Sequence, residues 1–357
     1  MFSIRLIIIL FLLPLLLTSC ANAPYMGRLA LGEAKILGGS VPYQEIIEDK
    51  GIDENKKEGI RLVQEVKEFS QKKLGLRLDG SYETFYQVRG DALIYLVSAC
   101  PKDSMKPYTW RFPVVGEVEY KGFFDRQDAV KEIKKLEEKG MDTCLQHVIA
   151  FSTLGWLRDP IYSTVLDCHP VVIINIIIHE LVHNTFYFKG ETEFNEQIAS
   201  FIAGKGSLMF IEERFGLRSP SYQRALDFSA DEVIMAGFFQ GLYGVLKGFY
   251  TQDLTREEKI SMREEIFAQG QRGLTELSKT LTTGDPSDHI GRLNNAVVLA
   301  YRRYLLSSES LLQKTYEALG DDVKSLIELL FTIKKSKEPP YRFLERWLQE
   351  RATPHSG

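Results

Sequence analysis

The sequence predicts an α+β protein that is predominantly helical, with a small sheet placed before a helical second half. Between residues 91 and 124, β-branched and aromatic residues are frequent and Pro and Gly interrupt them, which is typical of short strands. Helical spacing of apolar residues dominates residues 21–80 and nearly everything after residue 168. The chain has 357 residues, 44% of them hydrophobic, which allows a sizeable core.

The N-terminus has the features of an export signal. The apolar run Leu6–Leu17 is twelve residues long, too short to cross a bilayer as a stable helix but suited to the core of a signal peptide. It leads into Leu17-Thr18-Ser19-Cys20, which resembles the bacterial lipobox, where small residues precede a cysteine that becomes lipidated. We therefore predict a signal peptide over residues 1–19 and a lipid on Cys20. The alternative is a plain secretory signal with a chance cysteine.

The predicted location is the cell envelope, with the lipid on Cys20 holding the protein to a membrane. Ala21, rather than an aspartate, follows the cysteine and favours the outer membrane if the cell is Gram-negative. The remaining cysteines are Cys100, Cys144 and Cys168, so at most one disulfide can form among them. Core thiols are the preferred interpretation of these three.

The distribution of charged residues does not indicate a particular macromolecular partner for this chain. The formal net charge is −4, and acidic and basic residues are interspersed along the whole sequence. A protein that binds nucleic acid usually carries a basic stripe or patch, and the sequence has none. We therefore expect no nucleic-acid partner.

The N-terminal part, residues 20–90, is predicted to be a helical segment. Residues 23–48 and 54–74 alternate apolar and charged residues at helical spacing, with Gly51 between the two stretches and Gly75 after the second.

Residues 91–151 are predicted to form the small sheet. Strand-like sequence occurs at 91–100, 110–120 and 146–151, and a charged amphipathic helix at 125–139 is stopped by Gly140. The predicted helical half follows over residues 168–350. Its helices are expected to break near 190, 216–220, 251–254 and 284–288.

The pattern that carries chemistry is His179-Glu180-Leu181-Val182-His183, inside a strongly apolar helical stretch. Residues i and i+4 lie on one helix face, so both imidazoles can point at one metal ion. Glu180 lies about 100° round the helix, beside the open coordination position, without being a ligand. Two histidines and a glutamate are costly to bury in such a helix unless they have a partner. We therefore predict that His179 and His183 bind a metal and that Glu180 acts as a general base.

A third ligand is expected from the next helix. A turn at residues 189–191 ends the first helix, and Thr192 is a plausible N-cap for the second. Twelve residues separate His183 from Glu196, so an antiparallel second helix would return Glu196 to the two histidines. Two histidines and one glutamate leave the fourth position of zinc open, which is the catalytic arrangement. One Zn²⁺ is the predicted cofactor.

The chain resembles a family of bacterial lipoproteins described as “putative aminopeptidases”. The matching motifs run nearly from end to end: Trp110-Arg-Phe-Pro-Val-Val-Gly116, Tyr120-Lys-Gly-Phe-Phe124, Ser152-Thr-Leu-Gly-Trp156 with Asp159-Pro160 and Ser163-Thr164, His179-Glu-Leu-Val-His183, Phe194-Asn-Glu196, and Asn294-Asn-Ala296 with Tyr301. The resemblance implies a zinc-peptidase catalytic domain over residues 91–357, a peptide substrate, and the three ligands with Glu180 as catalytic residue.

Other candidate residues depend partly on this resemblance. A hydrolase needs a donor for the developing oxyanion, and Tyr301 is the candidate, seven residues after Asn294 and on the same helix face. Asn294 or Asn295 would position it or the substrate. His289 is the rival donor. Trp156 is a candidate substrate-binding wall, with core filler as the alternative, and His147 and His169 are interpreted as structural. Val148–Thr153 either pairs with an extended substrate or is a core strand.

Two departures from related peptidases leave alternatives open. Many zinc peptidases of the glutamate type have an acid four residues after the third ligand, where it supports a histidine, but here that residue is Ser200. The glycine-rich signature of large exopeptidases is also missing from the sequence. The alternatives to an aminopeptidase are therefore an endopeptidase or oligopeptidase of the same chemistry, and a non-enzymatic envelope lipoprotein with a structural metal site.

Overall fold

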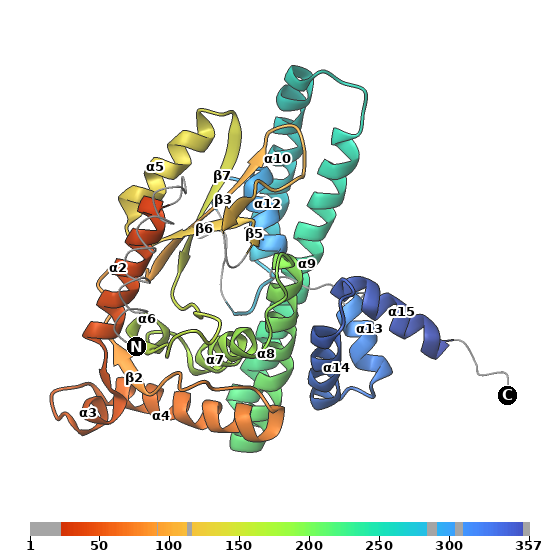
Figure 1. The fold of residues 1–357 in the computed structure, drawn as a ribbon. Coiled ribbons are helices and arrows are strands. Elements are labelled where there is room, and N and C mark those ends of the chain that lie inside the picture. Colours follow the sequence, from red (N-terminus) through yellow and green to blue (C-terminus); the bar gives the residue numbers. More distant parts are fainter. Residues whose placement is uncertain (1–22, 91, 113–115, 284–290, 304–309, 353–357) are drawn as a thin grey trace, which may run out of the picture.

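The computed structural model describes residues 23–90, 92–112, 116–283, 291–303 and 310–352 (Figure 1). Of the described residues, 62% are helical and 11% are in strands, with the small sheets in the N-terminal half and helices afterwards. The predicted α+β, predominantly helical fold is therefore confirmed. The predicted signal peptide and Cys20 lie outside the described residues. Within the described ranges, no helix has both the length and the apolar character to span a bilayer.

The N-terminal segment contains more breaks than the sequence predicted. The expected helix over residues 23–48 is divided into two helices by a short strand, because Pro42 has no N–H to donate and disfavours helical geometry in the residue before it. The second expected helix, 54–74, is confirmed and ends at Gly75, whose φ of 73° is left-handed. The elements are α2 (Ala23–Gly39), β1 (Val41–Pro42), α3 (Tyr43–Glu48), α4 (Glu54–Phe69), the π-helical turn η1 (Ser70–Leu74) and β2 (Thr84–Tyr86).

A three-stranded antiparallel sheet of order β6-β3-β7 is the centre of the N-terminal half. Two small sheets accompany it: β1-β2-β8 and the pair β4-β5. The strand predicted at 146–151 is present but is shifted toward the N-terminus and spans Met141–Val148. Gly140 ends the preceding helix, and pairing with β3 begins at Met141. The elements are β3 (Ile94–Pro101), β4 (Trp110–Phe112), β5 (Gly116–Val118), β6 (Tyr120–Phe123), α5 (Arg126–Glu137), β7 (Met141–Val148) and β8 (Ile161–Tyr162).

The two faces of the central sheet have different neighbours. Side chains alternate along a strand, so Tyr95, Val97 and Ala99 of β3 share one face, where they pack with residues of α2 and α5. Cys100 of β3 and Cys144 of β7 share the other face and pack with α9, α10 and α12. Figure 1 shows α2 and α5 on one side of the sheet and α12 on the other. Both cysteines are buried free thiols and Cys168 is a half-buried one, as expected.

The second half is helical, as predicted. Helix breaks occur near 190, 216–220 and 251–254, whereas the predicted break at 284–288 lies outside the described residues. The elements are α6 (Ser163–Leu166), α7 (Pro170–Thr185), α8 (Thr192–Phe215), α9 (Pro220–Tyr250), α10 (Arg256–Ser278), α12 (Asn295–Arg302), α13 (Leu311–Ala318), α14 (Val323–Lys335) and α15 (Pro340–Ala352).

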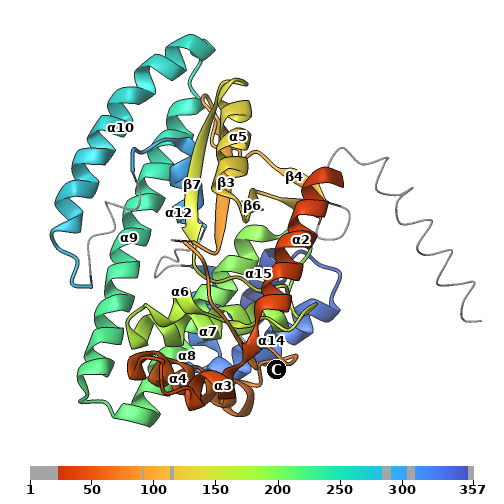
Figure 2. The same cartoon turned by 90° about the vertical axis from the view of Figure 1, so that its left-hand side faces the viewer.

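The largest hydrophobic core surrounds α7. Buried residues of α4, α7 and α8 form it together with α13, α14 and part of α15. In Figure 2, α9 and α10 lie side by side at one edge of the molecule, and α7 and α8 lie below the sheet. Helix α7 is thus covered on several sides, while part of it faces the sheet.

Candidate metal centre

Helix α7 begins at a well-defined cap. Pro170 occupies the first turn, where its missing N–H is not needed. The ring nitrogen Nδ1 of His169 accepts a hydrogen bond from the Val171 N–H at 3.3 Å, so this histidine caps the helix, in keeping with its expected structural role. The β-branched residues of α7 have only modest helix propensity, and their burial in the large core stabilises the helix instead. The metal-binding pattern therefore lies on a helix that packing holds rigidly.

Asn195 fixes the return from α7 to α8. Its side-chain amide donates to the Phe188 carbonyl at 2.8 Å and its Oδ1 accepts from the Phe188 N–H at 2.8 Å. This closed pair of hydrogen bonds sets the rotation of α8 relative to the turn. The next residue, Glu196, then points back at α7. The asparagine of the Phe194-Asn195-Glu196 motif thus has a physical task, namely to hold the glutamate in register.

The structure brings the three predicted ligands together. Nε2 of His179 and Nε2 of His183 are 3.1 Å apart, and Oε2 of Glu196 is 3.5 Å from the first nitrogen and 3.4 Å from the second. A tetrahedral zinc with ligand bonds of about 2.0–2.1 Å separates its ligand atoms by about 3.3 Å. The three spacings lie close to that value, so the residues fit one metal ion of this size.

The electrostatics of the group agree with a cation site. Burial alone would raise the pKa of Glu196, but the two imidazoles beside it outweigh burial and hold that pKa well below its usual range. Burial opposes a charge on His183, yet the Glu196 carboxylate raises the pKa of this histidine. A carboxylate with a lowered pKa that faces two ring nitrogens attracts either protons or a metal. At neutral pH a divalent cation can replace those protons.

Glu180 lies in the wall beside the three ligands. Its carboxyl group is largely buried, and this burial raises its pKa above the ordinary glutamate value despite the opposing effect of His179 and His183. A carboxylate with a raised pKa is a stronger base than one in water. The geometry therefore places a base next to the metal ligands without placing it among them.

Tyr120 supports the third ligand. Its hydroxyl donates to Oε1 of Glu196 at 3.3 Å, the oxygen that does not face the histidines. This contact supports the glutamate rather than a histidine, and it comes from β6, 76 residues away in sequence. The ring of Tyr120 lies in turn under the guanidinium of Arg303, 5.1 Å from its centroid.

A cavity of about 390 Å³ opens beside the ligands. One side of it is the sheet, through residues of β3, β6 and β7, and the other side is α7 with the start of α8. The segment after β7, residues 149–152, also lines it. A larger cavity of about 490 Å³ lies between α2 and α5, away from the ligand group. We assign the site to the smaller one, because it contains the ligands and Glu180.

Tyr301 does not line this cavity. Its ring stacks on Phe239 with centroids 5.3 Å apart, next to the core formed by α9, α10 and α12, and burial raises its pKa to about 12. Tyr120 and Tyr187 are the tyrosines that line the cavity. The tyrosines that border the cavity thus come from β6 and from the segment that follows α7. The rival donor, His289, lies outside the described residues.

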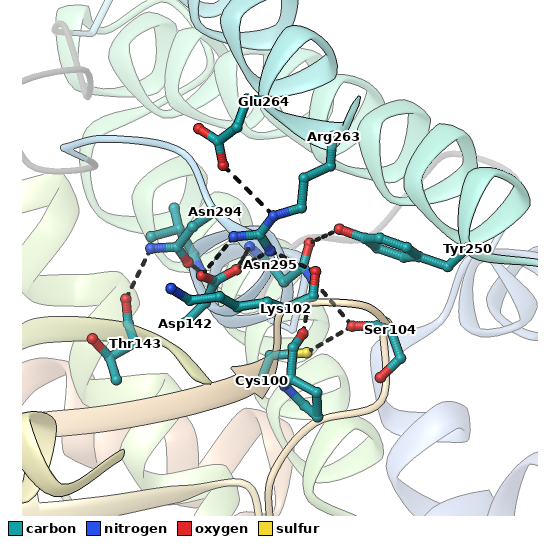
Figure 3. A network of polar contacts seen from close by, with 12 residues as sticks. Cys100, Lys102, Ser104, Asp142, Thr143, Tyr250, Arg263, Glu264, Asn294 and Asn295 are labelled. Carbon is teal, nitrogen blue, oxygen red and sulfur yellow. Dashed lines mark hydrogen bonds and ion pairs between the residues drawn. The ribbon is translucent and has the colours of Figure 1, made fainter. Parts of the chain in front are cut away.

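Asn294 and Asn295 take part in a buried polar network instead of lining the cavity (Figure 3). Asn294 caps α12 by accepting from the Val297 N–H at 2.9 Å, and it donates to the Thr143 carbonyl at 3.0 Å. Asn295 is fully buried and donates to the carbonyls of Pro101 and Ser104. Both amides attach α12 to the ends of β3 and β7.

Trp156 is neither a cavity wall nor core filler, because its side chain is 71% exposed and outside the lining. It follows Leu154 and Gly155, both with positive φ, in a loop bound to α7. The Ser152 hydroxyl donates to Oδ1 of Asn184, the residue after His183, and Asn184 Nδ2 donates to the Ser81 hydroxyl at 3.2 Å. The loop is thereby attached to the metal-binding helix, with Trp156 on its outer side.

His147 is on the opposite face of the sheet from Gln146, and its ring packs edge-on against Tyr95. Residues 148–152 line the cavity, but only Val148 belongs to a strand. The Ile149 carbonyl accepts from the Thr164 hydroxyl and the Thr153 N–H donates to Asp159. This segment is therefore held by side chains as an irregular continuation of β7.

Asn195, Tyr120, Tyr187 and Gln146 are among the residues of the site that sequence reasoning missed. Asn195 and Tyr120 stand inside two of the motifs quoted above, so those motifs carried a signal for them. Tyr187 and Gln146 had no local signal, because they reach the cavity only through the packing of β7 and α7.

Loss of the Glu196 carboxylate is expected to abolish tight metal binding. Purified protein without residues 1–19 should hold about one zinc per chain, and Glu196→Gln or His183→Ala should hold far less, since three protein ligands typically retain catalytic zinc. Metal content by mass spectrometry after dialysis measures this. Glu213→Gln, the same chemical change on an exposed part of α8, should retain the metal. Full occupancy in Glu196→Gln would contradict the ligand assignment.

Comparison with family models gives one match. The model described as “Putative aminopeptidase” matches residues 24–341, which span the sheet, the metal-binding helices and α12 to α14. Neither the comparison with curated proteins nor that with solved structures gave a match.

Proposed function

The chain belongs to the family described as “Putative aminopeptidase”, and from this membership we propose that it is a zinc-dependent peptidase. The observation that carries the proposal is the arrangement of His179, His183 and Glu196, which can hold a metal ion in the wall of a cavity. Zinc is favoured because two nitrogens and one oxygen at these spacings suit its tetrahedral coordination.

Metal ions in such sites polarise a carbonyl and lower the pKa of water. The chain supplies the proton transfers. In the proposed reaction, the Glu180 carboxylate takes a proton from the attacking water as the carbon–oxygen bond forms. Glu180 then gives this proton to the leaving amine as the carbon–nitrogen bond breaks. Its burial favours both steps, since it raises the pKa toward the range in which a carboxyl group can accept and return a proton.

The proposed substrate is a peptide, and a backbone edge is available for it. Among the described strands, β7 pairs only with β3, and its continuation through residue 152 lines the cavity. An extended peptide beside such an edge can bind through main-chain hydrogen bonds. This arrangement supports substrate pairing along Val148–Ser152 over the alternative of a fully enclosed core strand.

Digestion of a synthetic peptide mixture tests the proposal. Zinc-loaded protein is expected to cleave peptides, to lose this activity with a chelator and to regain it with zinc. Mass spectrometry of the products separates the two kinds of peptidase: single residues released from the N-terminus indicate an aminopeptidase, and internal fragments indicate an endopeptidase. Absence of cleavage by zinc-loaded protein across the mixture would contradict the proposal.

The non-enzymatic alternative predicts a different response to metal removal. A purely structural zinc site contributes to folding, so a chelator would lower the melting temperature strongly. Here the ligands border a cavity, and α7 packs into a large cluster of buried apolar side chains from α4, α7 and α8. A carboxylate at the position of Glu180 has no use in a structural site. We therefore expect chelation to remove activity and to change the melting temperature little.

We further propose that the protein acts from a lipid anchor at Cys20. The support is the apolar run Leu6–Leu17 followed by the lipobox-like Leu17-Thr18-Ser19-Cys20. Cys20→Ser is expected to lose incorporation of labelled fatty acid and to leave the membrane fraction. Fractionation after a high-salt and carbonate wash measures this. Continued membrane association of the variant would mean that the apolar run itself is a retained anchor.

A further inference from the structure

The cavity beside the metal ligands has a consistent chemical character. The register of the sheet pairs Leu96 of β3 with Gln146 of β7, so both lie on the face that meets the cavity, with Val148 two residues further along. From the other side, Ile176 reaches the cavity from three residues before His179, which puts it on the same helix face one turn away, about 5 Å along α7. An apolar pocket thus lies directly next to the ligands.

Charges in the lining are confined to the catalytic group and one histidine. Among the described residues that border the cavity, the acids are Glu180 and Glu196 alone, and no lysine, arginine or aspartate occurs. His147 borders it as well, although its ring packs against Tyr95 on the opposite face of the sheet. Apart from the catalytic group and His147, the lining offers no partner to a charged substrate side chain, which would lose its hydration here. An apolar side chain would gain about 25 cal/mol for each Å² removed from water.

Gln146 is a neutral polar side chain on the wall of this pocket that the sheet forms. It adds no charge to the lining, so it offers no ion-pair partner to a charged substrate side chain. A charged residue of the same size at this position would place a charge in the pocket wall.

We propose that this pocket selects peptides with an uncharged, apolar side chain next to the scissile bond, and that Gln146 keeps the sheet side of the pocket free of charge. Leu96, Val148 and Ile176 supply the apolar walls. The inference rests on the proposed function, because it names the substrate class of the same site. It concerns binding and can be measured without hydrolysis.

Hydroxamates of single amino acids are suitable probes, because the hydroxamate binds zinc and the side chain occupies the adjacent pocket. Leucine and phenylalanine hydroxamates are expected to bind zinc-loaded protein at least tenfold more tightly than lysine and glutamate hydroxamates by calorimetry. Peptides that differ only at the residue beside the cleaved bond should show the same order in kcat/KM. Equal affinity for leucine, lysine and glutamate hydroxamates, or no binding of any, would overturn the proposal.

A substitution in the pocket wall sharpens this test. Gln146→Glu is nearly the same size but places a carboxylate in the lining. It is expected to raise the affinity for lysine hydroxamate relative to leucine hydroxamate by at least tenfold. Gln71→Glu, the same change at an exposed position near the end of α4, should leave the ratio unchanged. An unchanged ratio in folded Gln146→Glu would contradict the proposed role of Gln146.

The probes separate failure of this inference from failure of the proposed function. Selective binding of leucine hydroxamate without cleavage of any peptide would support the proposed pocket and contradict the proposed peptidase activity. Cleavage of all peptides at equal rates would support the peptidase activity and contradict the proposed selectivity of the pocket. If Gln146→Glu fails to fold, the affinities of the wild-type protein for the leucine, phenylalanine, lysine and glutamate hydroxamates still test the selectivity of the pocket.

Discussion

Glu180→Gln is expected to retain the metal and the fold but to hydrolyse peptides at least about a hundredfold more slowly than the wild type. The substitution keeps the size of the side chain and removes the proton acceptor. A positioned general base typically contributes about 10²–10⁴ in rate, and each factor of ten corresponds to about 1.4 kcal/mol of barrier. Initial rates on one peptide identified in the digest measure the change.

Two further measurements show whether the slower hydrolysis of Glu180→Gln comes from loss of the base alone. Zinc content and melting temperature should remain near wild-type values, because Glu180 lies beside the ligands rather than among them. Glu213→Gln, on an exposed part of α8, should leave the rate unchanged. A Glu180→Gln variant that holds zinc and retains most of its activity would show that another group activates the water. A variant that loses zinc would instead place Glu180 among the ligands.

Asp142→Ala is expected to lower the free energy of unfolding by about 3–5 kcal/mol, the usual cost of leaving one partner of a buried ion pair alone. Both side chains of the pair are largely buried, 4% exposed for Arg263 and 7% for Asp142. Arg263 contacts both carboxylate oxygens, at 2.6 and 3.0 Å, and donates to the Lys102 carbonyl at 2.8 Å. Asp142 also accepts from the Asn295 N–H at 3.1 Å.

This pair holds three elements in one place. Figure 3 shows Arg263 of α10, Asp142 of β7 and Asn295 of α12 meeting around the carboxylate. The expected loss of about 3–5 kcal/mol in Asp142→Ala is large compared with a total free energy of unfolding of about 5–15 kcal/mol. Removing Arg263 as well, as in Asp142→Leu with Arg263→Met, is expected to recover part of it, because no buried charge then remains unpaired.

Urea unfolding measures these changes. The matched control is Arg272→Ala, which breaks an exposed ion pair with Glu265 on the same helix, where the side chains are 66% and 67% exposed. An exposed pair of this kind contributes about 0–1 kcal/mol. If Asp142→Ala destabilises the protein no more than Arg272→Ala does, the buried network does not hold the sheet to α10 and α12.

Prediction from sequence was most successful where the chemistry is local. The histidines of α7 share a face because four residues make about one helical turn, and this needs no knowledge of the rest of the chain. Glu196 follows after one short turn, so the return of α8 is nearly a local event as well. The strongly apolar stretch around the histidines likewise predicted a buried helix. These features depend on backbone periodicity and short loops.

Prediction of the surrounding site residues was less successful. Asn294 and Asn295 were expected near the substrate, but the fold uses both amides to hold α12, through partners 151–194 positions away in sequence. Tyr301 stacks on Phe239 of α9, and Trp156 faces solvent. A given residue type on a helix face is compatible with several roles. Which role it has depends on the element that packs against that face.

The sequence by itself determined the class of the fold and the identity and spacing of the three residues that can hold a metal ion, because both follow from periodicity along a few turns of chain. Only the tertiary structure decided which tyrosine supports Glu196, that Gln146 and Leu96 face the metal helix, and that Arg263 and Asp142 join distant elements. The physical reason is that these contacts depend on the register of β3, β6 and β7 and on the packing of α12. Long-range burial sets that register and packing, and no local pattern encodes them.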